Sequence, residues 1–163
     1  MVSLGINSII GLSMKKIVYV DMDNVLVNFQ SGIDQLPKNI VAKYKGRLDE
    51  IPGIFSLMEP VTDDLKSFKR LAQRLDTYVL STAPWENPSA WSDKLLWIKK
   101  HLGSFAYKRL ILTHHKNLNV GDYLIDDRKE NGADRFVGEH MLFGSERFPD
   151  WGSVMSYLLE RES

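Results

Sequence analysis

The feature that most constrains the fold is a short apolar run that ends in two acidic residues. Residues 17–20 (IVYV) are apolar, and residues 16–21 are predicted as a buried strand. Asp21 and Asp23 stand at its end. Two carboxylates beside a core cost free energy unless a cation or a proton compensates their charge. Ligands bind at the carboxyl ends of strands in open α/β sheets, so the run predicts a metal-assisted site at the end of a central strand.

Strands and helices alternate along the rest of the chain. Further strands are predicted at residues 77–81, 109–113, 123–126 and 140–143. Helices are predicted at residues 62–75, 88–102 and about 150–160. In the helix at 88–102, the spacing places on one face Trp91, Leu95, Ile98 and Leu102. Alternation of this kind indicates an α/β fold, with a central, mostly parallel sheet and helices on both faces.

One stretch interrupts the alternation. Between residues 30 and 62, two short helical stretches are punctuated by Pro37, Gly46, Pro52, Gly53 and Pro60. We predict a small helical cap at 30–61, inserted into a core domain made of 14–29 and 62–163. Residues 1–13 lack a basic start and a small-residue cleavage site, so they are predicted to be an extension outside the core and not a signal peptide.

The composition limits the classes of partner. Lys plus Arg and Asp plus Glu each number 21, so the net charge does not favour a nucleic acid polymer or an anionic membrane. The chain has no Cys, which excludes disulfides, thiol catalysis and Cys-ligated metal sites, and it fits a location in the reducing cytoplasm. The expected partner is a small molecule, and a homodimer is left open.

Polar or charged residues follow four of the predicted strands. After Asp21 and Asp23 come Ser81-Thr82, then Lys116, and then Asp126-Asp127. Because the carboxyl ends of parallel strands meet at one edge of a sheet, these groups are expected to converge. The set suits phosphoryl transfer: a carboxylate attacks phosphorus, a second carboxylic acid protonates the leaving oxygen, and a hydroxyl and an ammonium hold the phosphoryl oxygens. Further carboxylate would bind Mg²⁺, which prefers oxygen ligands.

In this order, the motifs resemble the haloacid dehalogenase superfamily of phosphohydrolases, over roughly residues 16–130. The resemblance implies a three-layer, Rossmann-like fold. It implies that Asp21 is the nucleophile that forms an aspartyl-phosphate, and that Asp23 is the general acid and then the base. The residues expected to bind phosphate are Ser81, Thr82 and Lys116. The expected Mg²⁺ ligands are the Asp21 carboxylate, the Asp23 backbone carbonyl and Asp126, with Asp127 in support.

Several segments are similar, more narrowly, to the 5'(3')-deoxyribonucleotidases. They are DMDNVLVNF at 21–29, PGIF at 52–55, STAP at 81–84, KLLWIKKHLG at 94–103 and LIDDR at 124–128. This resemblance implies dephosphorylation of nucleoside monophosphates. The aromatic residues expected to hold the base are Phe29, Tyr44, Phe55 and Trp85. Asn24 stands where that family usually has Gly, but Asn also tolerates a positive φ, so the turn is expected to survive.

Three alternatives remain at this stage. The same chemistry could act on another small phosphorylated metabolite, which a cap lined by polar residues would favour. A receiver-like phosphate-binding module combines similar residues. In a receiver, however, the acidic pair follows the first strand and the phosphoacceptor follows the third, whereas in this chain Asp21 and Asp23 follow the first strand and the acidic pair Asp126-Asp127 comes late. A phosphatase-fold protein that only binds ligand is the last, and the intact acidic residues argue against it.

Overall fold

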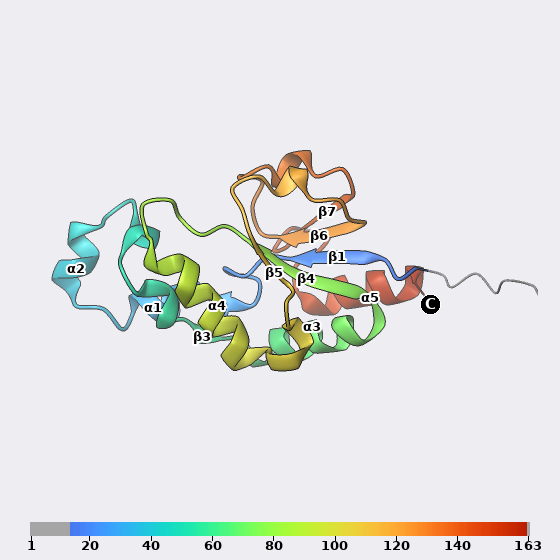
Figure 1. The fold of residues 1–163 in the computed structure, drawn as a ribbon, viewed down its shortest axis with the longest axis horizontal. Helices are drawn as coiled ribbons and strands as arrows, with labels where there is room; N and C mark the ends of the chain where they lie inside the picture. Colours follow the sequence, from blue (N-terminus) through green and yellow to red (C-terminus); the bar gives the residue numbers. More distant parts are fainter. Residues whose placement is uncertain (1–13, 163) are drawn as a thin grey trace, which may run out of the picture.

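A five-stranded parallel sheet forms the centre of the computed structural model, which describes residues 14–162 (Figure 1). The prediction for residues 1–13 lies outside the described residues. The strands are β1 (Ile17–Val20), β4 (Asp76–Ser81), β5 (Leu110–Leu112), β6 (Tyr123–Asp126) and β7 (Glu139–Leu142). Their order in the sheet is β5-β4-β1-β6-β7. All five strands were predicted within one residue at each end, and the α/β fold is confirmed.

The register of the sheet aligns the ends of its three middle strands. Val20 of β1 lies opposite Val79 of β4 on one side and Ile125 of β6 on the other. The ladder continues one step further, because the Asp21 amide donates to the Ile125 carbonyl at 2.9 Å. Asp21 and Asp126 therefore leave adjacent strands at the same level, as the shared edge of a parallel sheet requires.

The two faces of the sheet are covered differently. One face carries the main core beneath α3 (Thr62–Arg74) and α5 (Trp151–Arg161) (Figure 1). On the other face a smaller cluster joins the strand residues Tyr19, Leu80 and Leu124 to Ala133 and Phe136. The connections from β5 to β6 and from β6 to β7 contain only the 3₁₀ turns η4 (Lys116–Leu118) and η5 (Ala133–Arg135). Both connections run across the sheet in the direction opposite to those from β1 to β4 and from β4 to β5. Because such crossovers are right-handed, these turns lie on the second face.

The start of α5 is fixed to the loop that follows β1. Asp150 caps the helix by accepting from the Ser153 amide at 2.9 Å, and the Ser153 hydroxyl accepts from the Asp150 amide in return. Trp151, the first residue of the helix, donates its indole N–H to the Val25 carbonyl at 2.8 Å. The indole therefore ties the start of α5 to the loop between Asp21 and Val27.

The inserted segment, residues 30–61, projects beyond the ends of β1 and β4 (Figure 1). Its helices are α1 (Phe29–Ile33), α2 (Lys38–Lys43), η1 (Leu48–Glu50) and η2 (Ile54–Ser56). The chain enters and leaves through a small antiparallel pair, β2 (Val27–Asn28) with β3 (Glu59–Pro60), which the sequence did not indicate. The division into a core and a cap stays a prediction.

The predicted face of the helix at 88–102 is partly wrong. In α4 (Ser89–His101), Trp91 and Leu95 are 39% and 43% exposed, although Ile98 and Leu102 are buried as predicted. The buried face also contains Lys94 and Trp97. The Trp97 indole N–H donates to the Met58 carbonyl at 2.9 Å, so α4 turns this face toward the inserted segment. The orientation of the helix therefore depends on a polar contact, which the spacing of apolar residues does not indicate. η3 (Gly103–Ala106) follows α4.

Candidate active site

A tight loop after β1 presents Asp21 and Asp23. The Met22 carbonyl accepts from the amides of Leu26 and Val27 at 2.9 and 3.2 Å, and this folds the chain back on itself. Asn24 adopts φ = 57°, the left-handed conformation that Asn tolerates better than other non-glycine residues. The expectation that the turn would survive with Asn in this position is confirmed.

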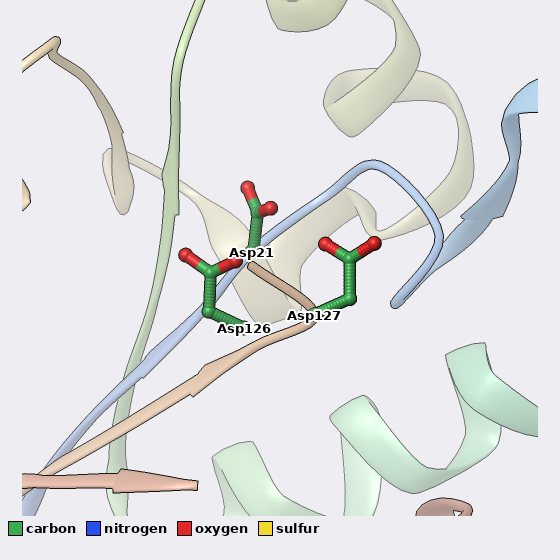
Figure 2. Close-up of side chains that lie close together, drawn as sticks. All are labelled: Asp21, Asp126 and Asp127. Atoms are coloured by element: carbon green, nitrogen blue, oxygen red, sulfur yellow. The ribbon is translucent and has the colours of Figure 1, made fainter. Parts of the chain in front are cut away.

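Three carboxylates converge at the ends of β1 and β6. Asp21, Asp126 and Asp127 each offer an oxygen, and these oxygens all lie within 4.8 Å of one another. Figure 2 shows Asp21 on the segment that leaves β1 and the other two on the segment that ends β6, with all three carboxylates turned to the same side. Asp21 and Asp126 are almost completely buried. The sequence predicted this convergence from adjacent strand ends.

The carboxylates repel one another in this setting. Burial and the charge of Asp21 raise the pKa of Asp126 to about 7, and the same two causes raise the pKa of Asp127. Oδ1 of Asp127 is buried and has no hydrogen-bond partner among the described residues, and Oδ1 of Asp21 is buried with Lys116 as an ionic neighbour. Carboxylate oxygens that are crowded and buried suit a hard cation, so these residues fit a divalent metal ion.

Lys116, at the start of η4, partly neutralises the acidic cluster. Its ammonium lies 2.5 Å from Oδ2 of Asp126 and 3.2 Å from Oδ1 of Asp21. Burial lowers the pKa of Lys116, but the charges of Asp21 and Asp126 outweigh burial and hold that pKa above its ordinary value. Lys116 is therefore a permanent cation between the two strand ends, where the sequence placed it.

The carboxylate of Asp23 has a different cation as its partner. The ammonium of Lys94, from α4, donates to Oδ2 of Asp23 at 2.7 Å and to the Ser81 hydroxyl at 2.9 Å. Lys94 and Ser81 are both 0% exposed. Burial raises the pKa of Asp23 and the charge of Asp21 raises it further, while Lys94 opposes both.

Sequence reasoning missed Lys94. A lysine on a surface helix is usually solvated, and nothing in the strand-end motifs refers to α4. A signal was nevertheless present, because helical spacing places Lys94 in line with Ala90, Trp97 and Ile98, which are all buried. A lysine within an apolar stripe needs a buried partner, and the partner here is Asp23.

A cavity of about 600 Å³ opens over these groups. This volume is typical of a site for a small organic ligand. Eight of the residues predicted for the site line it: Asp21, Asp23, Phe29, Phe55, Thr82, Trp85, Lys116 and Asp126. Three predicted residues are not among the described residues that line it: Ser81, Tyr44 and Asp127. The Ser81 hydroxyl is held by Lys94, and Tyr44 packs beneath the Arg47 guanidinium, 4.9 Å from its ring centre.

The cavity has an aromatic side and an acidic rim. Phe29 and Phe55 pack edge to face with ring centres 6.1 Å apart, and Trp85 is 76% exposed at the mouth. The carboxylates of Asp49 and Glu50, which belong to the inserted segment, also line the cavity, as do Glu86 and Arg128. The site therefore offers flat apolar surfaces for a ring and polar groups for its edge.

A buried asparagine fixes the inserted segment to the core side of this cavity. Asn87, fully buried, donates its side-chain amide to the carbonyls of Asp49 and Ile51 at 2.8 and 3.0 Å. Its own carbonyl oxygen accepts from the Ser89 hydroxyl at 2.8 Å. The loop that carries Trp85 is thus tied to the loop that carries Asp49, so both sides of the cavity mouth are fixed to one another.

No helix within residues 14–162 combines the length and the apolar character that crossing a membrane requires.

Comparison with known proteins gives a consistent result. Residues 47–148 match the family model described as "5' nucleotidase, deoxy (Pyrimidine), cytosolic type C protein". A protein of Vibrio phage KVP40 is 58% identical over 144 residues, which are 88% of this chain and 85% of the phage protein. A protein of Staphylococcus aureus strain Mu50 is 25% identical over 176 residues, covering 90% of this chain and 97% of its own length.

A third relative, from Bordetella bronchiseptica, is 36% identical over 94 residues, which are 56% of this chain and half of that protein. All three relatives are named as candidate 5'(3')-deoxyribonucleotidases. The family model covers more than half of the chain, and the phage protein aligns with most of it. The family of such enzymes implies a divalent metal, for which the acidic triad is suited. The chain therefore belongs to the 5'(3')-deoxyribonucleotidase family of the haloacid dehalogenase type and is a phosphoric monoester hydrolase of the 5'-nucleotidase class.

Proposed function

We propose that the protein hydrolyses nucleoside monophosphates, with deoxyribonucleotides preferred, through a phosphorylated Asp21 and with Mg²⁺ as the cation. The observation that carries this proposal is the convergence of Asp21, Asp23, Lys116 and the Asp126-Asp127 pair beside one aromatic-lined cavity. The names of the relatives support the choice of substrate. The lack of cysteine fits a reducing compartment, so the proposed place of action is the cytoplasm.

In the first step, a carboxylate oxygen of Asp21 attacks the phosphorus atom and forms an acyl phosphate. The bond between phosphorus and the ester oxygen breaks, and that oxygen takes a proton from Asp23 and leaves as the alcohol of the nucleoside. Lys116 is proposed to hold a phosphoryl oxygen during the transfer, which its distance of 3.2 Å from Asp21 supports.

In the second step, water attacks the phosphorus atom of the acyl phosphate. Asp23, now ionised, takes a proton from the water as the new bond forms, and the bond to Asp21 breaks to restore its carboxylate. Inorganic phosphate leaves. The sum of the two steps is one ester and one water consumed, and one alcohol and one phosphate produced.

The carboxylates of Asp21 and Asp126 would hold the Mg²⁺, together with the Asp23 backbone carbonyl and with Asp127 in support. When bound, this cation would neutralise charge on the phosphoryl oxygens and relieve the repulsion among the three carboxylates. The crowding of the three carboxylates, and the buried Oδ1 of Asp127 without a hydrogen-bond partner among the described residues, support this assignment.

The base is proposed to lie against the aromatic side of the cavity. Phe29, Phe55 and Trp85 line that side, and a nucleobase stacks well on aromatic rings. Thr82 lines the cavity where Ser81 does not, so Thr82 is the better candidate to bind phosphate; its hydroxyl donates to the Thr113 carbonyl at 2.8 Å and would have to turn from it to do so.

A second substrate class deserves a test, because the inserted segment also contributes Asp49 and Glu50 to the cavity. Carboxylates at this position would suit a sugar or another polar metabolite whose hydroxyl groups donate hydrogen bonds. The chemistry at Asp21 would be the same.

The test is phosphate release from a panel of phosphomonoesters, with Mg²⁺ or with EDTA. The panel contains dUMP, dTMP, dGMP, UMP, a 3'-nucleotide, several sugar phosphates and 4-nitrophenyl phosphate. We expect Mg²⁺-dependent release concentrated on deoxyribonucleotides. Release concentrated on sugar phosphates would replace the substrate and keep the mechanism, whereas no release from any compound would reject the proposed function.

A further inference from the structure

Lys94, a buried lysine outside the strand-end motifs, makes three hydrogen bonds through its ammonium. Its ammonium donates to Oδ2 of Asp23 at 2.7 Å, to the Ser81 hydroxyl at 2.9 Å and to the Thr82 carbonyl at 2.8 Å. The ring of Phe55 covers the same ammonium, with its centre 4.5 Å away. The side chain is 0% exposed.

Lys94 differs from Lys116, the other buried lysine of the site, in how many of its N–H donors are used. A lysine ammonium has three N–H donors, and Lys94 uses all three on protein acceptors. It has none left for a substrate. Lys116 makes one hydrogen bond, to Asp126, with Asp21 as a second ionic neighbour. Lys116 can therefore still donate to a phosphoryl oxygen, and Lys94 cannot.

The hydrogen bond from Lys94 orients the Asp23 carboxylate. Oδ2 is occupied by the ammonium, while Oδ1 is buried and has no hydrogen-bond partner within residues 14–162. Asp23 lines the cavity together with Asp21. Oδ1 is therefore the oxygen at which a proton can be exchanged without breaking a bond to Lys94. A rotation of the carboxylate that exchanged the two oxygens would have to break a short, charge-assisted hydrogen bond in a buried site.

We propose that Lys94 is the positioning residue for proton transfer by Asp23: it fixes the carboxylate through Oδ2 so that Oδ1 serves the leaving oxygen. The inference rests on the proposed function. Ser81 and the Thr82 carbonyl hold the ammonium from the β4 side, and Phe55 of the inserted segment closes it off from water. Ser81 acts in this network and not on the phosphate, in contrast to its role as expected from the family motif.

The test compares the first turnover of dTMP with that of 4-nitrophenyl phosphate, measured by rapid quench. Nitrophenolate leaves without a proton, whereas the nucleoside oxygen needs one. With Lys94→Met, we expect the first-turnover rate on dTMP to fall on the order of 10²-fold, and the rate on 4-nitrophenyl phosphate to fall less than about threefold. The substrate concentration at half-maximal rate should not change. Ser81→Ala should give the same pattern with a smaller amplitude.

Three further measurements complete the design. Lys100→Met, an exposed lysine on the same helix, should match the wild type. In an Asp23→Asn background, Lys94→Met should change the dTMP rate by less than about threefold, because a residue that acts only through Asp23 has nothing further to lose. Addition of ethylammonium to Lys94→Ala should restore part of the dTMP rate.

The outcomes distinguish the inference from the function on which it rests. Equal slowing of both substrates by Lys94→Met, or full additivity in the Asp23→Asn background, overturns the inference and leaves the function intact. If Ser81→Ala raises the half-saturating concentration of substrate, the Ser81 hydroxyl binds the phosphate and the proposed network is overturned. A wild type that releases no phosphate from either substrate rejects the function, and the inference with it. If Lys94→Met does not fold, the substrate pattern of Ser81→Ala decides.

Discussion

The strand-end region and the inserted segment line the same cavity with different kinds of side chain. At the ends of β1 and β6, buried or partly buried carboxylates pair with two buried lysines: Lys116 with Asp21 and Asp126, and Lys94 with Asp23. The inserted segment contributes the ring of Phe55 and the carboxylates of Asp49 and Glu50. Of these two carboxylates, Glu50 pairs with the exposed Arg47.

This difference indicates that the two regions have different roles in catalysis and in substrate binding. Buried charges cost a large desolvation free energy, so a chain retains them only where their position matters, as in proton transfer and metal binding. The rim charges and the exposed ring of Trp85 cost little and can vary, which suits the selection of a substrate. Changes at the strand ends are therefore expected to affect turnover, and changes at the mouth of the cavity to affect affinity.

The largest effect is expected from Asp21→Asn. An amide is a poor nucleophile, so kcat should fall on the order of 10⁴-fold or more, as when the nucleophile of a covalent mechanism is removed. The melting temperature should not fall, because the substitution removes one of three mutually repelling charges. Phosphate release and thermal unfolding test the two parts. Asp134→Asn, at an exposed aspartate, is the matched control. Residual turnover above a few per cent of wild type would remove Asp21 as the nucleophile.

The next effect concerns metal affinity and pH. Burial and the charge of Asp21 raise the pKa of Asp126 to about 7 in the metal-free protein. Below that pH, Asp126 keeps a proton that the cation must displace, so Mg²⁺ affinity should weaken by about tenfold for each further unit of pH. Above that pH, this dependence should disappear. Calorimetric titrations at several pH values measure it, and an affinity that does not change between acidic and neutral pH contradicts it.

A smaller effect is expected at the mouth of the cavity. Trp85→Ala removes an exposed ring and should raise KM for a nucleotide by about tenfold, since stacking of a base contributes roughly 1–3 kcal/mol. The value of kcat should stay within about twofold of wild type. Tyr107→Ala, which removes another exposed ring at a distance from this cavity, is the control. If Trp85→Ala instead lowers kcat and leaves KM unchanged, the ring does not bind the base.

The smallest effect is expected on stability alone. Asp150→Ala removes the cap of α5 and should lower the free energy of unfolding by about 1 kcal/mol. Steady-state kinetics should not change, because the Trp151 contact to Val25 is retained. Chemical denaturation and phosphate release measure the two quantities. A fall in kcat for a fully folded variant would mean that the cap also holds the loop after β1 in its active form.

The sequence predicted the parts of the site that follow strand ends. Apolar runs identify the strands, and the rule that parallel strands share a carboxyl edge then brings Asp21, Asp126 and Lys116 together. The turn at Asn24 was predicted from the tolerance of Asn for a positive φ. The β2–β3 pair was not predicted, because two strands of two residues each leave no period to detect.

The sequence by itself determined the sheet, the order of its motifs and the acidic cluster, because each depends on residues that are neighbours along a strand or at its end. Only the tertiary structure decided which face of α4 is buried, that Lys94 reaches Asp23 over 71 positions of the chain, and that Ser81 serves this lysine and is absent from the cavity wall. Those contacts depend on how a helix rotates against the sheet and the inserted segment. The rotation is set by the Trp97 hydrogen bond and by burial of a charge, and neither leaves a local pattern in the sequence.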